Sequence, residues 1–304
     1  MPMRHATLRQ LQVFETAARH LSYSRAAAEL HLTQPGVSMQ MRDLEADAGL
    51  PLFDRIGRRM HLTEAGALLL RHVHDIQRAL AEAEDGLAGL RGLTGGRINL
   101  GVTSTAKYFA PQLLARFRDQ HPALAFRLAV SNREAVVDAL AANAVDLAIM
   151  GRPPQALETV AAAFAPHPFV VIAAPGHPLA RRHRLPLAAL SEESFLVREP
   201  GSGTRTAMQG YFDAQGVVVR IGMEMASNET IKQAVMAGMG IAFISRHTID
   251  LELATKRLVL IDVQGLPVMR EWFVVHLAAK RLSPTAQAFR EFVLKHGRAM
   301  LAKR

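Results

Sequence analysis

The sequence contains no cysteine, and this absence excludes disulfide scaffolds, thiolate zinc sites and cysteine nucleophiles. It also lacks any uninterrupted apolar run near the ~18 residues that a membrane-spanning helix needs. The first residues carry neither the apolar core nor the small-residue cleavage site of a signal peptide. We therefore expect a cytoplasmic protein that does not associate with a membrane.

The composition is otherwise that of an ordinary globular protein, with 49% apolar and 21% charged residues. At about 150 residues per domain, a chain of 304 residues is expected to form two domains. The net charge of +9 favours an anionic partner. Residues 1–95 nevertheless carry 11 basic and 11 acidic side chains. A nucleic-acid site must therefore be argued from the local arrangement of residues and not from bulk charge.

The first sixty residues predict three short helices followed by a hairpin. One helix ends near His20, a second covers residues 25–30 and a third covers residues 33–48. Two helices of this length joined by a turn of three to four residues form a helix-turn-helix. Residues 52–56 and 59–62 flank a glycine and are expected to form a hairpin-like wing.

The third helix and its surroundings carry residue types that read DNA. A recognition helix contacts base edges with polar side chains on its first turns, while flanking groups hold phosphates. Gln34 and Ser38 lie on one face of this helix, and glutamine can form two hydrogen bonds with adenine. The alternative is an ordinary solvated helix in an α-helical domain. The predicted DNA-binding residues are Ser22, Ser24, Thr33, Gln34, Pro35, Ser38, Met39, Arg42, Arg55, Arg58 and Arg59.

A long helix is predicted to begin at Thr63, and apolar side chains recur along it at alternating steps of four and three residues. This spacing is the a/d seam of a coiled coil, sustained over three heptads, and polar side chains occupy the other faces. The pattern favours self-association through this helix. The alternative is that the apolar stripe packs on the helix's own domain. The predicted dimerisation residues are Leu69, Val73, Ile76, Leu80, Ala83, Leu87 and Leu90.

From residue 97 onward, short apolar runs alternate with helical segments. The predicted strands are residues 98–102, 126–130, 146–150, 168–173, 241–245, 258–261 and 272–276. The predicted helices are residues 106–120, 134–143, 205–215, 229–236 and 284–301. Strand–helix alternation predicts an α/β domain with largely parallel sheets. The return of a strand and a helix after residue 268 predicts two lobes joined by crossing strands.

Several motifs resemble the LysR-type transcriptional regulators, and the resemblance covers essentially the whole chain. The amino-terminal motifs are Ala26-Ala27-Ala28-Glu29-Leu30, Thr33-Gln34-Pro35, Val37-Ser38, Leu44-Glu45, Leu52-Phe53-Asp54-Arg55 and Leu62-Thr63-Glu64-Ala65-Gly66. Within the family, the chain is similar to the CbbR group, activators of Calvin-cycle (RuBisCO) operons. This finer similarity rests on residues 101–111 (GVTSTAKYFAP), 149–154 (IMGRPP), 198–205 (REPGSGTR) and 227–238 (SNETIKQAVMAG).

Gly36 departs from the family pattern, because such regulators usually carry alanine there. Glycine in this place lowers helix stability by about 0.5–1 kcal/mol. It also removes a methyl group that could contact a base.

The resemblance implies an α/β protein with an amino-terminal winged helix-turn-helix, a long linker helix and a two-lobed effector domain like a periplasmic binding protein. The implied division is residues 1–62, 63–93 and 97–304, the last in lobes of about 97–166 plus 268–304 and about 167–267. The implied partners are double-stranded operator DNA with an interrupted palindrome, further copies of the chain in a homodimer or homotetramer, and RNA polymerase.

Hydroxyl and amide side chains stand at several helix amino termini of the α/β part, where N–H groups and the positive helix end bind anions. Each of them alone is also explained as a helix cap. The resemblance implies that they converge on one cleft for a small anionic effector, either a phosphorylated metabolite or NADPH. Lys107, Arg152 and Arg205 would add positive charge there, or would instead be solvated or paired within the protein. The full predicted effector-binding set is Thr103, Ser104, Thr105, Lys107, Ser131, Asn132, Arg152, Gly201, Ser202, Gly203, Thr204, Arg205, Ser227 and Asn228.

Two other function classes share an α/β fold, namely a transporter's solute-binding protein and a small-molecule enzyme. The first leaves the helix-turn-helix unexplained and would need a signal peptide. The second would need a nucleophile, metal or cofactor motif, and none of the common ones is present. A LysR-type regulator of another metabolic operon stays open as a nearer alternative.

We expect no metal site and no cofactor. His72 and His74 lie two apart on a helix and point to different faces. His167, His177 and His183 stand near proline or arginine and are expected in surface loops.

Overall fold

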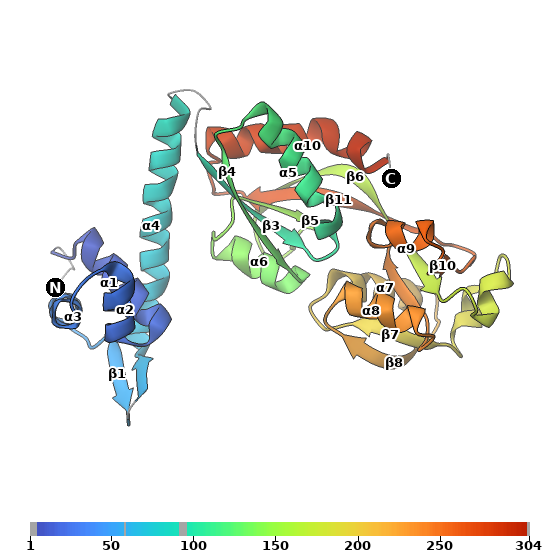
Figure 1. Cartoon of the computed structure of the whole chain (residues 1–304), viewed down its shortest axis with the longest axis horizontal. Coiled ribbons are helices and arrows are strands. Elements are labelled where there is room, and N and C mark those ends of the chain that lie inside the picture. The colour runs from blue at the N-terminus through green and yellow to red at the C-terminus, as the bar shows by residue number, and fades with distance from the viewer. Residues whose placement is uncertain (1–4, 58, 91–95, 303–304) are drawn as a thin grey trace. The chain divides into compact units, whose positions relative to one another are not determined.

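The computed structural model describes residues 5–57, 59–90 and 96–302, and the chain divides into two compact units, Met1–Ala83 and Glu84–Arg304 (Figure 1). The division falls within the long helix α4 (Glu64–Leu90).

The first unit is a winged helix-turn-helix, as the sequence predicted. Its elements are α1 (Leu8–His20), α2 (Tyr23–Leu30), α3 (Gln34–Ala48), the antiparallel hairpin β1 (Phe53–Ile56) and β2 (Arg59–Leu62), and the first turns of α4. Thr7, Ser22 and Thr33 each accept a hydrogen bond from a backbone N–H of the helix that follows, which fixes where the three helices begin. Phe14 and Leu44 lie at the centre of the core that these helices share.

The second unit is built on one seven-stranded sheet and a smaller two-stranded sheet. The strands of the large sheet are β3 (Arg97–Thr103), β4 (Ala125–Ser131), β5 (Leu147–Met150), β6 (Thr159–Ala173), β9 (Ala242–Ser245), β10 (Val259–Leu260) and β11 (Val268–Leu277). Strands β6 and β11 are long and run through both lobes. They pair antiparallel, with Thr159 opposite Leu277 at one end of the pairing and Phe169 opposite Val268 at the other. The small sheet pairs β7 (Ser194–Arg198) with β8 (Arg220–Met225) in parallel.

Lobe 1 comprises β3, β4 and β5 with α5 (Ala110–Gln120), α6 (Arg133–Ala141) and α10 (Pro284–Ala302). Lobe 2 comprises β7 to β10 with α7 (Gly203–Ala214), α8 (Asn228–Met236) and α9 (Asp250–Ala254). In lobe 1, α5 and α10 cover one face of the sheet and α6 covers the other (Figure 1). The core of lobe 1 contains the buried rings of Phe117, Trp272 and Phe289. A core of lobe 2 contains those of Phe195 and Phe212. The expectation of two lobes joined by crossing strands is confirmed.

Some predicted details are wrong. The expected helix over residues 106–120 is split at Phe109 into a 3-10 turn, Ala106–Tyr108, and α5, because Pro111 has no N–H to continue a helical hydrogen-bond series and stands in the first turn of α5, where none is needed. The sheets are not largely parallel: β3 pairs in parallel with β4 and β5, but β11 pairs antiparallel with both β5 and β6. Strands β7 and β8 were not predicted, although Ile221, Met223 and Met225 alternate along the largely exposed β8 and a short apolar run, 195–197, forms the centre of β7.

Candidate functional site

The recognition helix α3 presents polar side chains on its first two turns. Its N-cap Thr33 accepts a hydrogen bond from the N–H of Gly36 (3.2 Å), and Pro35 stands in the first turn. Gln34, Pro35, Met39 and Arg42 are exposed, and Ser38 is half-buried. The opposite face of α3 packs into the core through Val37, Met41 and Leu44. This arrangement leaves one face of α3 available for a DNA groove.

The wing and the start of α2 hold the other predicted DNA-binding residues. Arg55 and Arg59 are exposed on the β1–β2 hairpin, whereas Arg58 lies outside the described residues. Ser22 caps α2 by accepting a hydrogen bond from the Arg25 N–H, and Ser24 is exposed within α2. The two wing arginines therefore stand where a phosphate backbone could reach them.

The apolar seam of α4 is divided between two roles. Val73 is fully buried in the core of the first unit, and Leu69 packs against that core. These two residues therefore pack within their own domain, which corrects that part of the dimerisation prediction. Further along α4, Ile76 and Leu80 are 40% and 41% exposed, and Ala83 and Leu87 are also exposed. The side chain of Leu90 lies outside the described residues.

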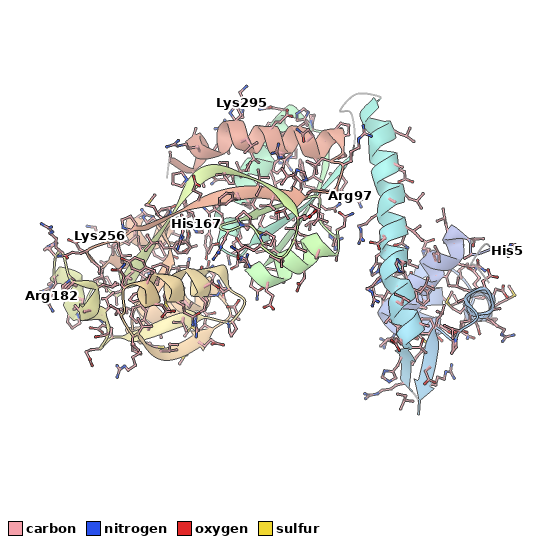
Figure 2. The ribbon with its side chains drawn as sticks, turned by 180° about the vertical axis from the view of Figure 1, so that it is seen from behind. His5, Arg97, His167, Arg182, Lys256 and Lys295 are labelled. Atoms are coloured by element: carbon pink, nitrogen blue, oxygen red, sulfur yellow. The ribbon has the colours of Figure 1, made fainter. Side chains whose placement is uncertain are left out.

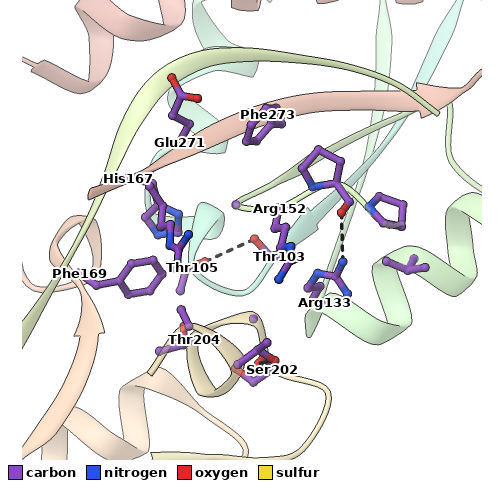
Figure 3. Close-up of a pocket in the computed structure, with 18 of the residues that line it drawn as sticks. Thr103, Thr105, Arg133, Arg152, His167, Phe169, Ser202, Thr204, Glu271 and Phe273 are labelled. Carbon is purple, nitrogen blue, oxygen red and sulfur yellow. Dashed lines mark hydrogen bonds between the residues drawn. The ribbon is translucent and has the colours of Figure 1, made fainter. Parts of the chain in front are cut away.

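A cavity of about 890 Å³ lies between lobes 1 and 2 of the second unit (Figure 3). Ligand pockets of about 300–1,000 Å³ are typical of small-molecule sites. Seven of the predicted effector residues line it, namely Thr103, Ser104, Thr105, Arg152, Ser202, Gly203 and Thr204.

The polar lining of the cavity comes from strand ends and from a helix start. Parallel strands β3 and β5 end at the same edge of the sheet, which brings Thr103 and Thr105 next to the segment that follows β5. Across the cavity, α7 begins at Ser202, whose buried side chain forms no capping hydrogen bond. The positive end of α7 therefore faces a space lined by hydroxyl groups, which favours an anion.

Arg133, Arg152 and Arg270 add positive charge to this lining, and Glu271 adds a negative charge. Arg133, at the start of α6, donates a hydrogen bond from Nη2 to the backbone oxygen of Pro153 (3.3 Å). Its Nε is buried and has no hydrogen-bond partner within the part of the chain that the structure describes. Burial, together with the positive charge of Arg152, lowers the pKa of Arg133 below its usual range. Two guanidinium groups that repel one another in a cavity are the arrangement that a bound anion stabilises.

The sequence did not identify Arg133, His167, Phe169 or Phe273 as cavity residues. The prediction that His167 lies in a surface loop is wrong, because it is buried on β6. No local signal marks these residues, since their positions depend on strands and helices that meet only in the fold.

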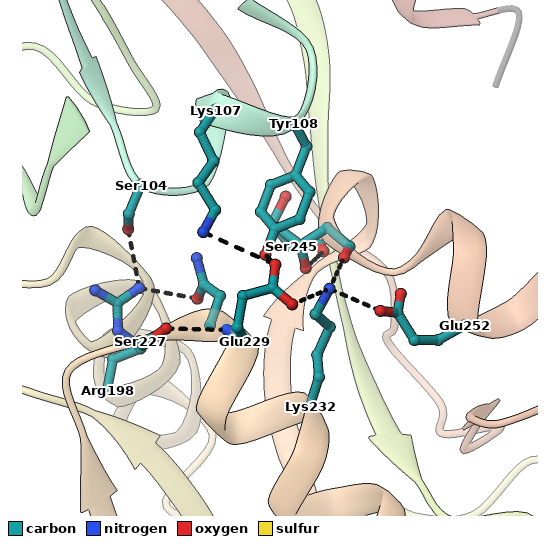
Figure 4. A network of polar contacts seen from close by, with 11 residues as sticks. Ser104, Lys107, Tyr108, Arg198, Ser227, Glu229, Lys232, Ser245 and Glu252 are labelled. Carbon is teal, nitrogen blue, oxygen red and sulfur yellow. Dashed lines mark hydrogen bonds and ion pairs between the residues drawn. The ribbon is translucent and has the colours of Figure 1, made fainter. Parts of the chain in front are cut away.

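A second group of predicted effector residues lies in a network of polar contacts that joins the lobes (Figure 4). Arg198 of lobe 2 donates from Nη1 to Oγ of Ser104 in lobe 1 (3.0 Å) and to Oδ1 of Asn228 (2.8 Å). Arg198 also forms two hydrogen bonds with Glu199. Ser227 caps α8 by accepting from the N–H of Glu229. We call this group, with the Lys232 contacts below, the interlobe network.

Lys232 is a second buried cation of the interlobe network, beside Arg198. Its Nζ lies 2.8 Å from Glu252 and 3.0 Å from Glu229, and it donates to the backbone oxygen of Thr248. The Tyr108 hydroxyl of lobe 1 donates to Glu229. Burial, and the hydrogen bond to the Glu229 carboxylate, raise the pKa of Tyr108 well above its usual range. Lobe 1 is therefore bound to lobe 2 through Tyr108 as well as through Ser104.

The remaining predicted effector residues are occupied elsewhere. Lys107 pairs with Glu229 (3.8 Å), and Arg205 donates to the backbone oxygen of Arg198 (2.9 Å) and to Glu224. Asn132 caps α6, and Ser131 ends β4. The backbone oxygen of Gly201 accepts a hydrogen bond from the N–H of Glu134, a further contact between the lobes. The predicted convergence of four helix starts on one cleft is therefore corrected, because of the four predicted segments only residues 103–105 and 202–204 line the cavity, together with Arg152 from the segment after β5.

Within the described part of the chain, no helix is long and apolar enough to span a membrane. Nor does that part bring three or more His, Asp or Glu side chains together in a group that could hold a metal ion.

Two family models match the chain. The model described as "Bacterial regulatory helix-turn-helix protein, lysR family" matches residues 8–67, and the model described as "LysR substrate binding domain" matches residues 91–298. The RuBisCO operon transcriptional regulator of Allochromatium vinosum is 51% identical over 296 residues, which cover 97% of this chain and 98% of that protein.

Two solved structures are also similar. The regulatory domain of Synechocystis PCC6803 CcmR in complex with 2-PG is 41% identical with a TM-score of 0.64, and the match covers 66% of this chain and 96% of that one. Full-length CbnR complexed with its target DNA is 22% identical with a TM-score of 0.75, and the match covers 95% of this chain and 99% of that one. At this lower identity the likeness to CbnR shows a shared fold.

Proposed function

This chain belongs to the LysR family of bacterial helix-turn-helix regulators, and we propose that it activates carbon-fixation (RuBisCO) genes in response to a small phosphorylated metabolite. Like the relatives that it matches, it is a DNA-binding transcriptional regulator and not an enzyme. The observation that carries the carbon-fixation role is 51% identity over nearly the full length of a RuBisCO operon regulator.

We propose that α3 enters the major groove of operator DNA, with Gln34 and Ser38 reading bases and the wing arginines Arg55 and Arg59 holding phosphates. Polar and exposed side chains on the first turns of α3 support this mode. A homodimer or homotetramer formed through the exposed part of α4 would place two such helices on an interrupted palindrome. This activity places the protein in the cytoplasm, where it would act with RNA polymerase.

The effector proposed for the cavity is an anion that carries phosphate. The N-terminus of α7, the hydroxyl groups of Thr103 and Ser202, and the adjacent charges of Arg133 and Arg152 all favour negative charge. The related CcmR regulatory domain was solved with 2-PG, which we take to be 2-phosphoglycolate. Phosphorylated intermediates of carbon metabolism are therefore the first class to test, and NADPH is the second.

A mobility-shift titration tests the proposed genetic role. The labelled probes are the promoter fragment of a RuBisCO operon and a shuffled fragment of the same length and composition, at one fixed salt concentration. We expect the promoter to bind at least about 10³-fold more tightly, as specific sites usually do. Equal affinity for both fragments contradicts the proposal. Tight binding to the promoter of another metabolic operon alone replaces the carbon-fixation role with a different regulon.

A further inference from the structure

His167 occupies an unusual place in the cavity between the lobes. It lies on β6, where Figure 2 shows it at the junction of the lobes, and it is only 3% exposed. Its imidazole ring stacks on the indole of Trp272, with ring centroids 3.7 Å apart and planes inclined by 14°. Phe169 packs against the ring from another direction at 4.3 Å. The ring is therefore held in one orientation by aromatic contacts.

The two ring nitrogens of His167 differ in their surroundings. Nε2 lies 3.0 Å from Oγ of Ser245 on β9. Nδ1 is buried and has no hydrogen-bond partner among the described residues. It faces Gly151, a residue of the cavity lining, and a Cβ built on Gly151 would lie only 2.7 Å from Nδ1. A side chain larger than that of glycine would thus displace the imidazole, and glycine leaves Nδ1 beside the cavity.

The charge state of His167 follows from its neighbours. Burial, and then the nearby His247, lower its pKa well below the ordinary value of 6.5. The other charged residues that line the cavity are Arg133, Arg152, Arg270 and Glu271, so arginines predominate and the imidazole is neutral at physiological pH. A neutral imidazole carries one proton, and its two nitrogens then act as one donor and one acceptor. If the Ser245 hydroxyl donates to Nε2, the proton lies on Nδ1, next to the cavity.

His167 lies apart from the groups that favour phosphate. Figure 3 shows His167 and Phe169 on one side of the cavity, and Arg133 with Ser202 on the other. A phosphate held by Arg133 and the start of α7 therefore leaves the rest of the ligand to extend toward His167. An unpaired buried donor at that place is unfavourable unless a ligand atom accepts from it.

We propose that His167 determines effector specificity: Ser245 donates to its Nε2, and its Nδ1–H donates to an oxygen at the end of the ligand remote from the phosphate. The site would then select short phosphorylated acids, whose carboxylate accepts this hydrogen bond, over phosphate alone. This inference rests on the proposed function, because it assumes that an anion with phosphate occupies the cavity.

Calorimetry on the full chain tests the inference, with 2-phosphoglycolate and inorganic phosphate as the two probes. His167→Phe keeps an aromatic ring against Trp272 and removes both nitrogens, and His167→Asn restores an amide donor near the place of Nδ1. His183→Phe is the control, because it makes the same change at an exposed histidine. We expect His167→Phe to bind 2-phosphoglycolate at least tenfold more weakly, His167→Asn to recover part of that loss, and phosphate affinity to stay within twofold in every variant.

The outcomes separate this inference from the proposed function. The specificity role is overturned if His167→Phe binds 2-phosphoglycolate as tightly as the wild type does. It is also overturned if His167→Phe loses affinity for 2-phosphoglycolate and for phosphate by the same factor. In both cases the anion site stands. If the wild type binds neither probe, the phosphate-bearing effector is overturned, and the role of His167 with it. Nitrogen NMR of the histidine-labelled wild type with 2-phosphoglycolate is a second test, and the signals that are missing from His167→Phe assign His167 among the 13 histidines. A proton on Nδ1 of His167 supports the inference, and a proton on Nε2 contradicts it.

Discussion

Nη1 of Arg198 lies 3.0 Å from Oγ of Ser104, and this hydrogen bond connects lobe 2 to a residue that also lines the effector cavity. The same guanidinium holds Asn228 at the start of α8 and pairs with Glu199. A ligand that takes the hydroxyl of Ser104 would thus alter a contact that joins the lobes. This gives a physical route from an occupied cavity to a changed angle between the lobes.

Replacing Arg198 by alanine should destabilise the second unit by about 3–5 kcal/mol, because Glu199 would keep a largely buried charge without its partner. Urea unfolding measures this change. Arg181→Ala, at an exposed arginine, should stay within about 0.5 kcal/mol of the wild type. A loss below about 1 kcal/mol for Arg198→Ala would show that the network adds little to stability.

Gln34→Ala and Arg55→Ala should weaken DNA binding in different ways. Loss of a base contact by Gln34 should cost about 1–3 kcal/mol at the cognate operator and relax specificity at one base pair. Loss of a phosphate contact by Arg55 should weaken all sequences alike and lower the salt slope by about one unit. Fluorescence anisotropy with cognate and random DNA at several salt concentrations measures both. Equal weakening on both DNAs by Gln34→Ala would contradict its role in base reading.

Leu80→Asp should abolish self-association through α4, because a charge in an apolar interface is strongly unfavourable when it is unpaired. The unfolding temperature of the first unit should change little, since Leu80 is 41% exposed there. Val73→Ala is the contrasting control, which should lower stability through a core cavity and leave the oligomer intact. Analytical ultracentrifugation decides the matter, and an unchanged oligomer for Leu80→Asp would rule out this interface.

The stability of the second unit should fall as the pH is lowered below 6.5, and His167 should be one cause. The unfolded chain binds a proton at His167 below its ordinary pKa of 6.5, whereas the folded chain, where that pKa is lowered, does not. His276, whose pKa is also lowered by burial, adds a similar dependence in every variant. Between pH 7.5 and 5.5 the wild type should therefore lose about 1 kcal/mol more unfolding free energy than His167→Phe. Chemical denaturation at the two pH values measures this difference. If the wild type and His167→Phe lose the same unfolding free energy, the buried neutral state of His167 is contradicted.

The helix-turn-helix was predictable because its signals are local. Thr33 caps α3 and Gly49 ends it in a left-handed conformation, both of which sequence patterns indicate directly. Ser202 was found for the same reason, since it stands at a helix start. Arg133 was not, because its nearness to Arg152 arises only when α6 and the segment after β5 meet.

His167 was misplaced because Pro166 and Pro168 flank it, and prolines favour a loop over a central strand. In the fold both prolines pair with β11, and the pairing of β6 with β9 begins only at Phe169. The strand can therefore continue through residues without a backbone donor.

The division of the α4 seam could not be predicted for a different reason. A stripe of apolar residues does not indicate which of those residues are buried by their own domain.

The central claim is that a phosphorylated anion in the interlobe cavity changes DNA binding. Anisotropy of a labelled RuBisCO promoter fragment, titrated with the full chain in the presence and absence of 2-phosphoglycolate, tests it most directly. We expect the ligand to shift operator affinity by about 5–150-fold. In Ser202→Ala and Thr105→Val, which remove hydroxyl groups from the cavity, the shift should shrink while ligand-free operator affinity stays nearly unchanged. A wild-type operator affinity that no phosphorylated metabolite alters at millimolar concentration would contradict the account.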